Sequence, residues 1–160
     1  MKISGIRIDI PKGVNIILGQ SHFIKTVEDI YEVLATSMPN IKFGLAFCEA
    51  SGPSLIRYDG TDKRSIRLAT DIAKRIAAGH SFVVILNGAY PINVLNRIKD
   101  VEEVVGIYCA TANSISVIIA DDDNGRAILG VIDGVRPKGT EDRSSKMDRH
   151  KLLRDLGYKL

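Results

Sequence analysis

"SFVVILNG", residues 81–88, is the stretch that decides the fold. Its run of five apolar residues includes three β-branched ones, which is typical of a strand buried on both faces. Asn87 and Gly88 supply turn-forming residues where the run ends. A strand buried on both faces needs a covering layer on each side, so these residues predict a sheet with helices packed on it, an α/β fold.

Helical patterns flank this strand on both sides. Upstream, apolar residues share one helical face: Ile66, Ala69, Ile72, Ala73 and Ile76. Asp62 can cap the start of this helix, and we expect Gly79 to take the left-handed position at its end. Downstream, Pro91 opens the helical segment 91–100, because proline is tolerated at the first helical position.

The rest of the chain alternates between strand and helix patterns. Residues 3–10 and 14–18 predict a hairpin, and residues 27–38 predict a helix that Pro39 stops. Further strands are expected at 41–50, 54–60 and 104–112, a hairpin at 114–134 with positive φ at Asn124-Gly125, and a last helix at 146–156. The predicted order is ββαββαβαβββα, a single domain over residues 1–160 with a mixed β-sheet, hairpins and helices packed on it.

Composition favours a cytoplasmic globular protein. The 160 residues are 45% hydrophobic and 26% charged, with the two kinds interleaved, which suits one domain and argues against disorder. No apolar run approaches the ~18 residues of a membrane span, and the N-terminus lacks the pattern of a secretory signal. Cys48 and Cys109 lie in apolar runs and are interpreted as reduced core residues, with a reactive thiol as the alternative.

The net charge of +3 is unevenly distributed. From Arg136 onward there are eight Lys or Arg against four Asp or Glu. Such a basic segment can meet phosphate or nucleic acid, or it can form an amphipathic helix with a solvated face. The chain has no Trp and no ordered interleaving of aromatic and basic residues, so nucleic-acid binding is poorly supported.

"GQSHFIKT", residues 19–26, matches the phosphate-loop pattern G-x-x-x-x-G-K-[ST] at every position except Ile24, where glycine belongs. The segment lies between a predicted strand and a predicted helix, where free N–H groups and the helix dipole converge on an anion. A side chain at position 24 interferes with the close wrap of a Walker loop. We therefore do not expect an ordinary P-loop NTPase.

His22 lies inside this loop and is a candidate phosphate carrier. A phosphohistidine here would be stabilised by the helix N-terminus, by the Ser21 hydroxyl and by Lys25. The alternative is a plain helix cap, in which Ser21 and His22 satisfy the first turn together with Thr26 and an acidic residue.

Polar residues at other strand ends are candidate ligand contacts. Glu49 follows a predicted buried strand and can hold a ribose hydroxyl, a magnesium ion or the imidazole, or serve the turn. Arg57 and Asp59 alternate along the next strand and are expected to pair with each other. Asn87 and Asn93 can supply amide groups to a pocket that recognises a base, although they are also good turn formers.

Four blocks of the sequence resemble the adenosine-specific kinase family, a small archaeal and bacterial family. They are GQSHFIKTVEDIYE, FCEASGPSLIRYDG, GHSFVVILNGAYPINVLNRIK and LLRDLGYKL, and they span nearly the whole chain in order. The resemblance implies an α/β domain that forms a homo-oligomer, binds adenosine or AMP and uses a phosphorylated histidine. It assigns the phosphohistidine role to His22 and adenosine binding to the strand-end loops.

The sequence therefore predicts a phosphotransferase for a small-molecule nucleoside or nucleotide, with a nucleoside triphosphate and Mg²⁺ as donor. His22 and Lys25 are the expected catalytic residues. The expected binding residues are Gly19, Gln20, Ser21, Thr26, Glu49, Asn87 and Asn93. One alternative is a sensor or regulator that binds adenine nucleotides without turnover, and a weaker one is a nucleic-acid-associated protein. The sequence does not show where a metal ion would bind.

Overall fold

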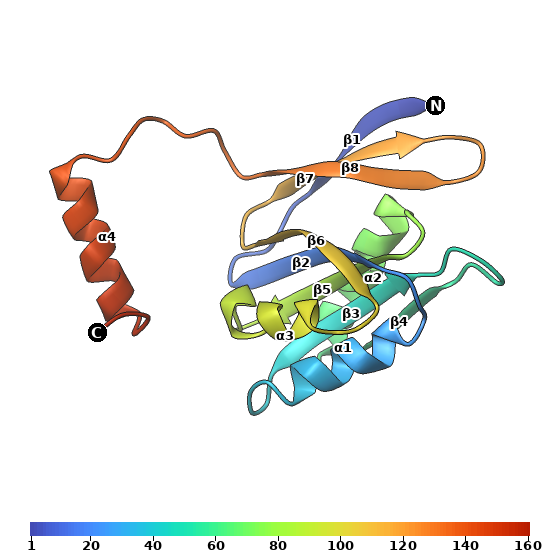
Figure 1. The fold of residues 1–160 in the computed structure, drawn as a ribbon, viewed down its shortest axis with the longest axis horizontal. Helices are drawn as coiled ribbons and strands as arrows, with labels where there is room; N and C mark the ends of the chain where they lie inside the picture. Colours follow the sequence, from blue (N-terminus) through green and yellow to red (C-terminus); the bar gives the residue numbers. More distant parts are fainter.

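Eight strands and four α-helices follow one another in the order that the sequence predicts (Figure 1). The computed structural model describes residues 1–160. The strands are β1 Lys2–Ile8, β2 Val14–Ser21, β3 Lys42–Cys48, β4 Ile56–Gly60, β5 Ser81–Asn87, β6 Val104–Thr111, β7 Ile115–Asp121 and β8 Arg126–Asp133. The helices are α1 Thr26–Ala35, α2 Lys63–Ile76, α3 Leu95–Lys99 and α4 Arg143–Asp155, with a 3₁₀ turn η1 at Pro91–Asn93. The α/β class and the element order are confirmed.

The strands form two sheets, and every pairing is antiparallel. The larger sheet has the order β4-β3-β5-β2-β6, with β5 at its centre, and the smaller one has the order β1-β7-β8. In place of the single mixed sheet that the sequence predicts, the strands form two separate sheets without any parallel pair. The expected hairpin between β1 and β2 is wrong: β2 uses both of its edges to pair with β5 and β6, so β1 pairs with β7 in the other sheet.

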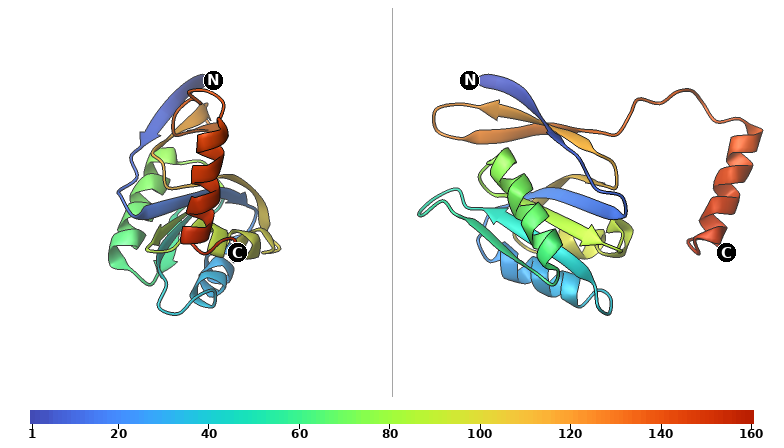
Figure 2. Two further views of the ribbon diagram at one scale, coloured as in Figure 1. Left: turned by 90° about the vertical axis from the view of Figure 1, so that its left-hand side faces the viewer. Right: turned by 180° about the vertical axis from the view of Figure 1, so that it is seen from behind.

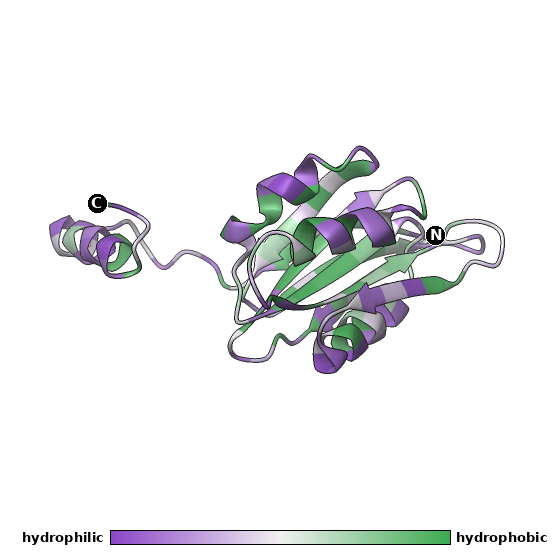
Figure 3. Cartoon of the chain, turned by 90° about the horizontal axis from the view of Figure 1, so that it is seen from below, coloured by the Kyte–Doolittle hydropathy of each residue, from purple (hydrophilic) through white to green (hydrophobic).

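The larger sheet is apolar on both faces because successive side chains along its strands point alternately into two cores. Along β2, Ile17 points to one core while Ile16 and Leu18 point to the other. The first core lies under α1 and α3, which contribute Val27, Ile30, Leu34 and Ile98. Figure 3 shows the apolar strands between helices whose outer surfaces are polar.

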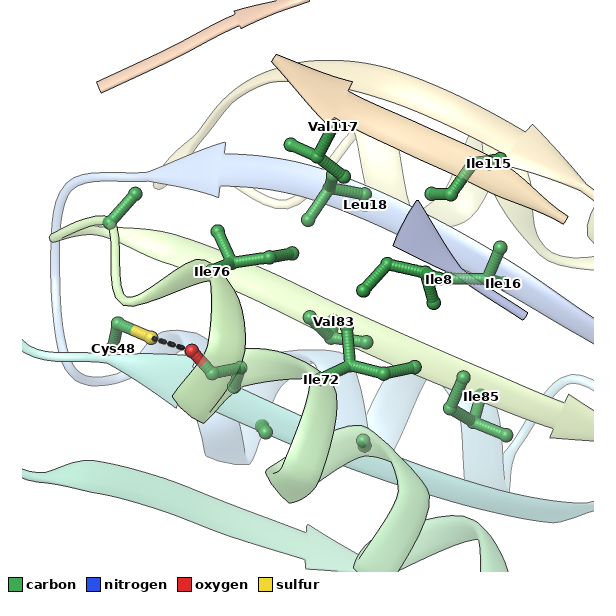
Figure 4. Packing of buried hydrophobic residues seen from close by; sticks show 14 of the residues in the cluster. Ile8, Ile16, Leu18, Cys48, Ile72, Ile76, Val83, Ile85, Ile115 and Val117 are labelled. Atoms are coloured by element: carbon green, nitrogen blue, oxygen red, sulfur yellow. Dashed lines mark hydrogen bonds between the residues drawn. The ribbon is translucent and has the colours of Figure 1, made fainter. Parts of the chain in front are cut away.

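The second core lies between the larger sheet, α2 and the smaller sheet (Figure 4). Ile72 and Ile76 of α2 belong to the same buried cluster as Ile115 and Val117 of β7. The Cys48 thiol is buried there and lies 3.8 Å from the Ala73 carbonyl oxygen, as the core interpretation of this cysteine predicts. The smaller sheet therefore covers the part of this face that α2 leaves exposed.

Helix α2 begins where the sequence predicts and lies directly on β3. The Asp62 carboxylate accepts a hydrogen bond from the Ser65 N–H at 3.0 Å, which caps the first turn. Gly44 of β3 has no side chain, and an added methyl group there would overlap the backbone of Ser65 and Ile66. This glycine permits the contact between helix and sheet.

Two turns differ from the predictions. The left-handed residue after α2 is Ala77, at φ 49°, because the helix ends earlier than expected, whereas Gly79 packs against Ala50 with no positive φ. The β7–β8 hairpin is confirmed, but neither residue of Asn124-Gly125 has positive φ. The Asp122 carboxylate accepts both of their N–H groups instead, which closes the turn with right-handed residues.

The C-terminal arm, residues 135–160, stands apart from the rest of the molecule (Figures 1 and 2). An extended segment leads away from β8 to α4, a helix with no buried residue. Every side-chain hydrogen bond and ion pair that the arm makes lies within the arm. The arm therefore contributes nothing to the core of its own chain.

No helix in the structure is both long and apolar enough to cross a membrane.

Gly44→Ala should lower the free energy of unfolding by about 3 kcal/mol, because the new methyl group forces α2 away from β3. Urea denaturation followed by circular dichroism measures the loss. Gly5→Ala in β1 is the matched control, since its methyl group would meet only Ile118 at 3.8 Å. Equal stabilities of the two variants would contradict the proposed close approach.

Candidate functional site

The end of β2 is held from both sides just before α1 begins. The Ser21 N–H donates to the His80 carbonyl at 2.9 Å, and the His22 N–H donates to the Glu103 carbonyl at 3.1 Å. His80 precedes β5 and Glu103 precedes β6, so both neighbours of β2 in the sheet supply one anchor. The loop from His22 to Lys25 is therefore fixed relative to the sheet at its first residue.

Hydroxyl groups hold the other end of the loop. The Thr26 hydroxyl lies 2.5 Å from the Phe23 carbonyl and 2.7 Å from the Ser21 hydroxyl, and Ser21 and Thr26 are both buried. The predicted helix cap by Ser21 and His22 is not present, because Lys25 is the N-cap residue and its side chain makes no capping hydrogen bond. Ser21 and Thr26 thus shape the loop from beneath.

Gly19 and Gln20 support the loop from within β2. An added methyl group at Gly19 would overlap the Phe82 ring, so this glycine is needed for packing. The side-chain oxygen of Gln20 accepts a hydrogen bond from the Tyr108 hydroxyl at 3.2 Å. Both residues are close to the loop, as the sequence predicts. Gly19, however, serves the packing of Phe82, and the Gln20 side chain is already hydrogen-bonded to Tyr108.

Three consecutive backbone donors remain free at the start of α1. The N–H groups of Phe23, Ile24 and Lys25 have no acceptor in the protein. Unpaired N–H groups at the positive end of a helix form an anion site. No residue from 21 to 26 has positive φ, so Ile24 fits the loop without strain and a second glycine is not required. His22, directly before these three donors, is exposed.

Lys25 lies between two carboxyl groups. Its Nζ is 2.7 Å from an oxygen of Asp29, one helical turn later, and 3.9 Å from an oxygen of Glu103. The hydrogen bond between them lowers the pKa of Asp29 and raises the pKa of Lys25. Burial raises the pKa of Glu103, whose side chain is only 3% exposed, and contact with Asp29 raises it further.

A hollow lies on each side of the loop. One, of about 350 Å³, is lined by Lys25, Asp29, Glu32, Val33, Thr36, Arg97, Asp100, Val101 and Glu102. The other, of about 390 Å³, lies between α1 and β4 and is lined by Ile24, Val27, Glu28, Ile56, Arg57, Tyr58 and Asp59. The first is mainly charged, whereas the second combines apolar side chains, an aromatic ring and polar groups. The second therefore has the mixture of apolar and polar groups that is typical of small-molecule pockets.

Glu49 lies at the same edge of the sheet as the loop but serves a turn. Its carboxylate accepts hydrogen bonds from the Leu55 N–H at 2.7 Å and from Arg57 at 2.8 Å. These bonds, that of Leu55 first, lower the pKa of Glu49. The expected pair between Arg57 and Asp59 is wrong, because Glu49 is within reach and takes the guanidinium.

Asn87 and Asn93 lie at the other end of the larger sheet. In the β2–β5 register Gln20 pairs with Ser81 and Val14 pairs with Asn87. Asn87 is therefore about 20 Å along the strand from the loop. Asn93 accepts a hydrogen bond from the Tyr90 N–H at 3.2 Å within η1. The structure does not bring these two amides together with His22.

Tyr58 and Glu103 lie near the loop and were missed by the sequence analysis. Glu103 carries a recognisable signal, since "VEEVV", residues 101–105, places acidic residues directly before an apolar strand. Tyr58 is 61% exposed on β4, and a single tyrosine in a strand pattern gives no signal of its own. Neither residue can be connected to the loop without the strand order.

Other chemistry finds little support in the side chains. No group of three or more His, Cys, Asp or Glu side chains is arranged to hold a metal ion. Burial raises the pKa of Cys109 to about 11, so its thiol stays protonated at neutral pH and is a poor nucleophile.

Two comparisons with known proteins give matches that cover nearly the whole chain. The family model described as "Adenosine specific kinase" matches residues 6–159. The crystal structure of the PH1918 protein from Pyrococcus horikoshii OT3 is similar, with 44% identity and a TM-score of 0.94. The match covers 99% of this chain and 98% of that one. A search of curated proteins finds no match.

Proposed function

The chain belongs to the adenosine-specific kinase family, and from that premise we propose a phosphotransferase that binds adenosine or AMP and carries a phosphoryl group on His22. Family membership supports an adenosine-related kinase activity. The phosphohistidine and the site residues are the specific content of our proposal.

One observation carries the proposal: three free N–H groups, those of Phe23, Ile24 and Lys25, follow directly after an exposed histidine. A phosphoryl group on the imidazole of His22 would lie beside these donors and near the Lys25 ammonium. Its charge is stabilised by N–H dipoles and by a cation that belong to the same loop. The anchors at Ser21 and His22 fix that geometry before phosphate arrives.

The chemistry needs two displacements. In the first, an imidazole nitrogen of His22 attacks the terminal phosphorus of a nucleoside triphosphate, a P–N bond forms, and a P–O bond breaks to release the diphosphate. In the second, a nucleoside hydroxyl attacks the same phosphorus, the P–N bond breaks, and the hydroxyl proton passes to solvent. Both steps depend on positioning and on charge stabilisation, which the loop supplies.

The hollow between α1 and β4 is our candidate for the nucleoside. It begins at Ile24 and is therefore continuous with the loop, and Tyr58 offers an exposed ring on which a base can stack. Arg57 and Asp59 add polar groups at its rim. The sequence-based candidates Asn87 and Asn93 remain a competing proposal for base recognition at the far end of the sheet.

Glu49 and the remaining loop residues keep supporting roles in this proposal. Glu49 positions Arg57 at the hollow through their 2.8 Å contact. Gly19, Gln20, Ser21 and Thr26 hold the loop in shape. Magnesium is proposed to accompany the phosphates of the nucleoside triphosphate, since no side-chain cluster of the chain suits a metal ion.

The alternative is a regulator that binds adenine nucleotides without turnover. It shares the hollow and the anion site with the kinase proposal. Phosphate on His22 that never passes to adenosine would favour this alternative.

We also propose a homo-oligomer in which the C-terminal arm binds a second copy of the chain. A 13-residue helix without tertiary contacts is marginal in water, so α4 needs a partner. The PH1918 structure matches 99% of this chain with a TM-score of 0.94, so its arm follows a similar path. The arm carries eight basic residues against four acidic ones, whereas the rest of the chain has a small negative net charge, so the two are complementary.

His22→Ala should abolish phosphorylation of the protein, because the acceptor nitrogen is removed. Intact-mass spectrometry after incubation with ATP and Mg²⁺, before and after mild acid, measures acid-labile phosphate. His150→Ala is the matched control, an exposed histidine on α4. Phosphate that persists on the His22→Ala protein would refute the carrier role.

Tyr58→Ala should weaken adenosine binding about tenfold, because a stacking surface for the base is lost. Isothermal titration calorimetry measures the dissociation constant. Tyr90→Ala is the control, since its ring is 58% exposed and lies beside Asn93. A loss confined to the Tyr90 variant would move the nucleoside to the Asn87 end of the sheet.

Replacing Leu152 and Leu156 together by Asp should convert an oligomer to a monomer. The two side chains lie one turn apart on the same face of α4 and are more than half exposed. Size-exclusion chromatography with light scattering gives the mass. Met147→Asp alters the opposite face and should leave the mass unchanged. A monomeric native chain would exclude the proposal.

A further inference from the structure

Glu103 is a buried carboxyl group that the proposed reaction does not use. Its side chain is 3% exposed, and neither of its oxygens has a hydrogen-bond partner. A buried carboxylate without donors is costly and needs either a cation or a proton. The only cation paired with it is the Lys25 ammonium, 3.9 Å away.

Asp29 completes the arrangement around this ammonium. It lies 2.7 Å from Lys25 Nζ and is also in contact with the carboxyl group of Glu103. Two adjacent carboxylates repel each other, so the pair stays fully ionised only while the ammonium lies between them. The side chain of Lys25 is 47% exposed, which leaves it room to move away.

The same lysine is the one cation of the phosphate loop. Its own N–H is one of the three free donors, yet its ammonium points to Asp29. A phosphoryl group at the loop would attract this ammonium, and one ammonium cannot neutralise both the phosphate and the carboxyl pair. Glu103 remains beside the loop in either case, because its carbonyl accepts the His22 N–H at 3.1 Å.

We propose that Glu103 and Asp29 are positioning residues. They hold the Lys25 ammonium in the ligand-free protein and release it to a bound phosphoryl group, and the carboxyl pair takes up one proton from solvent in its place. The lysine stays protonated throughout. The proton binds to the carboxyl pair, so the charge beneath the loop is unchanged when the ammonium leaves. This inference rests on the proposed function for the identity of the phosphoryl ligand.

Other charged side chains near the pair are exposed and therefore screened. They are Glu32 of α1, Arg97 of α3, and Asp100 and Glu102 of the following turn. Arg97 is held by hydrogen bonds to Ser37 and Thr36. None of these groups forms an ion pair with Asp29 or Glu103 that could replace the Lys25 ammonium.

The direction of the pH effect follows from the exchange. Loss of the ammonium raises the pKa of the carboxyl pair, so the ligand-bound protein binds the extra proton at a pH where the free protein does not. Affinity is then highest below the pKa of the pair in the free protein, and it falls as the pH rises from that value to the pKa of the bound state. The fall approaches about tenfold per pH unit for one proton.

Calorimetry of AMP binding in buffers of different ionisation enthalpy measures the exchanged protons. We expect proton uptake that is largest between the pKa of the pair in the free protein and its pKa in the AMP-bound protein, measured from about pH 5 to about pH 8 and corrected for the phosphate of AMP, which titrates near about pH 6. Glu103→Gln and, independently, Asp29→Asn should abolish the uptake. Glu102→Gln, which changes the neighbouring exposed carboxyl group, should retain it. AMP binding without proton uptake by the native protein would overturn the inference.

A ligand-free measurement separates this inference from the proposed function. Lys25→Met removes the ammonium permanently, so the side-chain carboxyl carbon of Glu103, followed by NMR, should titrate at least about one pH unit higher than in the native protein. Lys151→Met removes a lysine with a similar one-turn partner, Asp155, and should cause no change. An unchanged titration in Lys25→Met would refute the exchange. Absence of AMP binding would instead refute the proposed function, and the titration would still decide whether the pair takes up a proton.

Discussion

The larger sheet has no polar face, and the rest of the structure depends on covering it. Its strands direct alternate side chains into two separate cores, so water must be excluded on both sides. Helices α1 and α3 cover one face, but α2 alone is too narrow for the other. The smaller sheet completes that layer through Ile115 and Val117. The need to cover this face explains why β1 pairs with β7 in the smaller sheet and not with β2.

The candidate site arises where this buried sheet ends. β2 has a neighbour on each edge, and the two neighbours contribute the carbonyl groups that fix Ser21 and His22. The chain must then turn at once into α1 to cover the first core, which leaves the next N–H groups without acceptors. The run of unpaired N–H groups is thus a consequence of how a central strand connects to a covering helix. Lys25 and its carboxyl partners are additions to that backbone arrangement.

The period-two and helical patterns predicted the elements well, because burial on both sides leaves an unmistakable apolar run such as residues 82–86. The loop at 19–26 was recognised for the same reason, since it separates two strong patterns. Strand partners were predictable only for the β7–β8 hairpin. The β1–β2 hairpin fails because pairing depends on which edges remain free. Glu103 and Tyr58 escaped notice because they reach the loop only through the strand order β4-β3-β5-β2-β6.

The right-handed backbone of the loop has a consequence for how such proteins are detected. Glycine is required in a phosphate loop only where the chain takes a positive φ or wraps tightly, and residues 22–25 do neither. The donors belong to the main chain, so many side chains at position 24 preserve them. Searches that demand a glycine signature will overlook loops of this kind. A search for consecutive unpaired N–H groups at helix starts would find them in chains whose sequences share nothing.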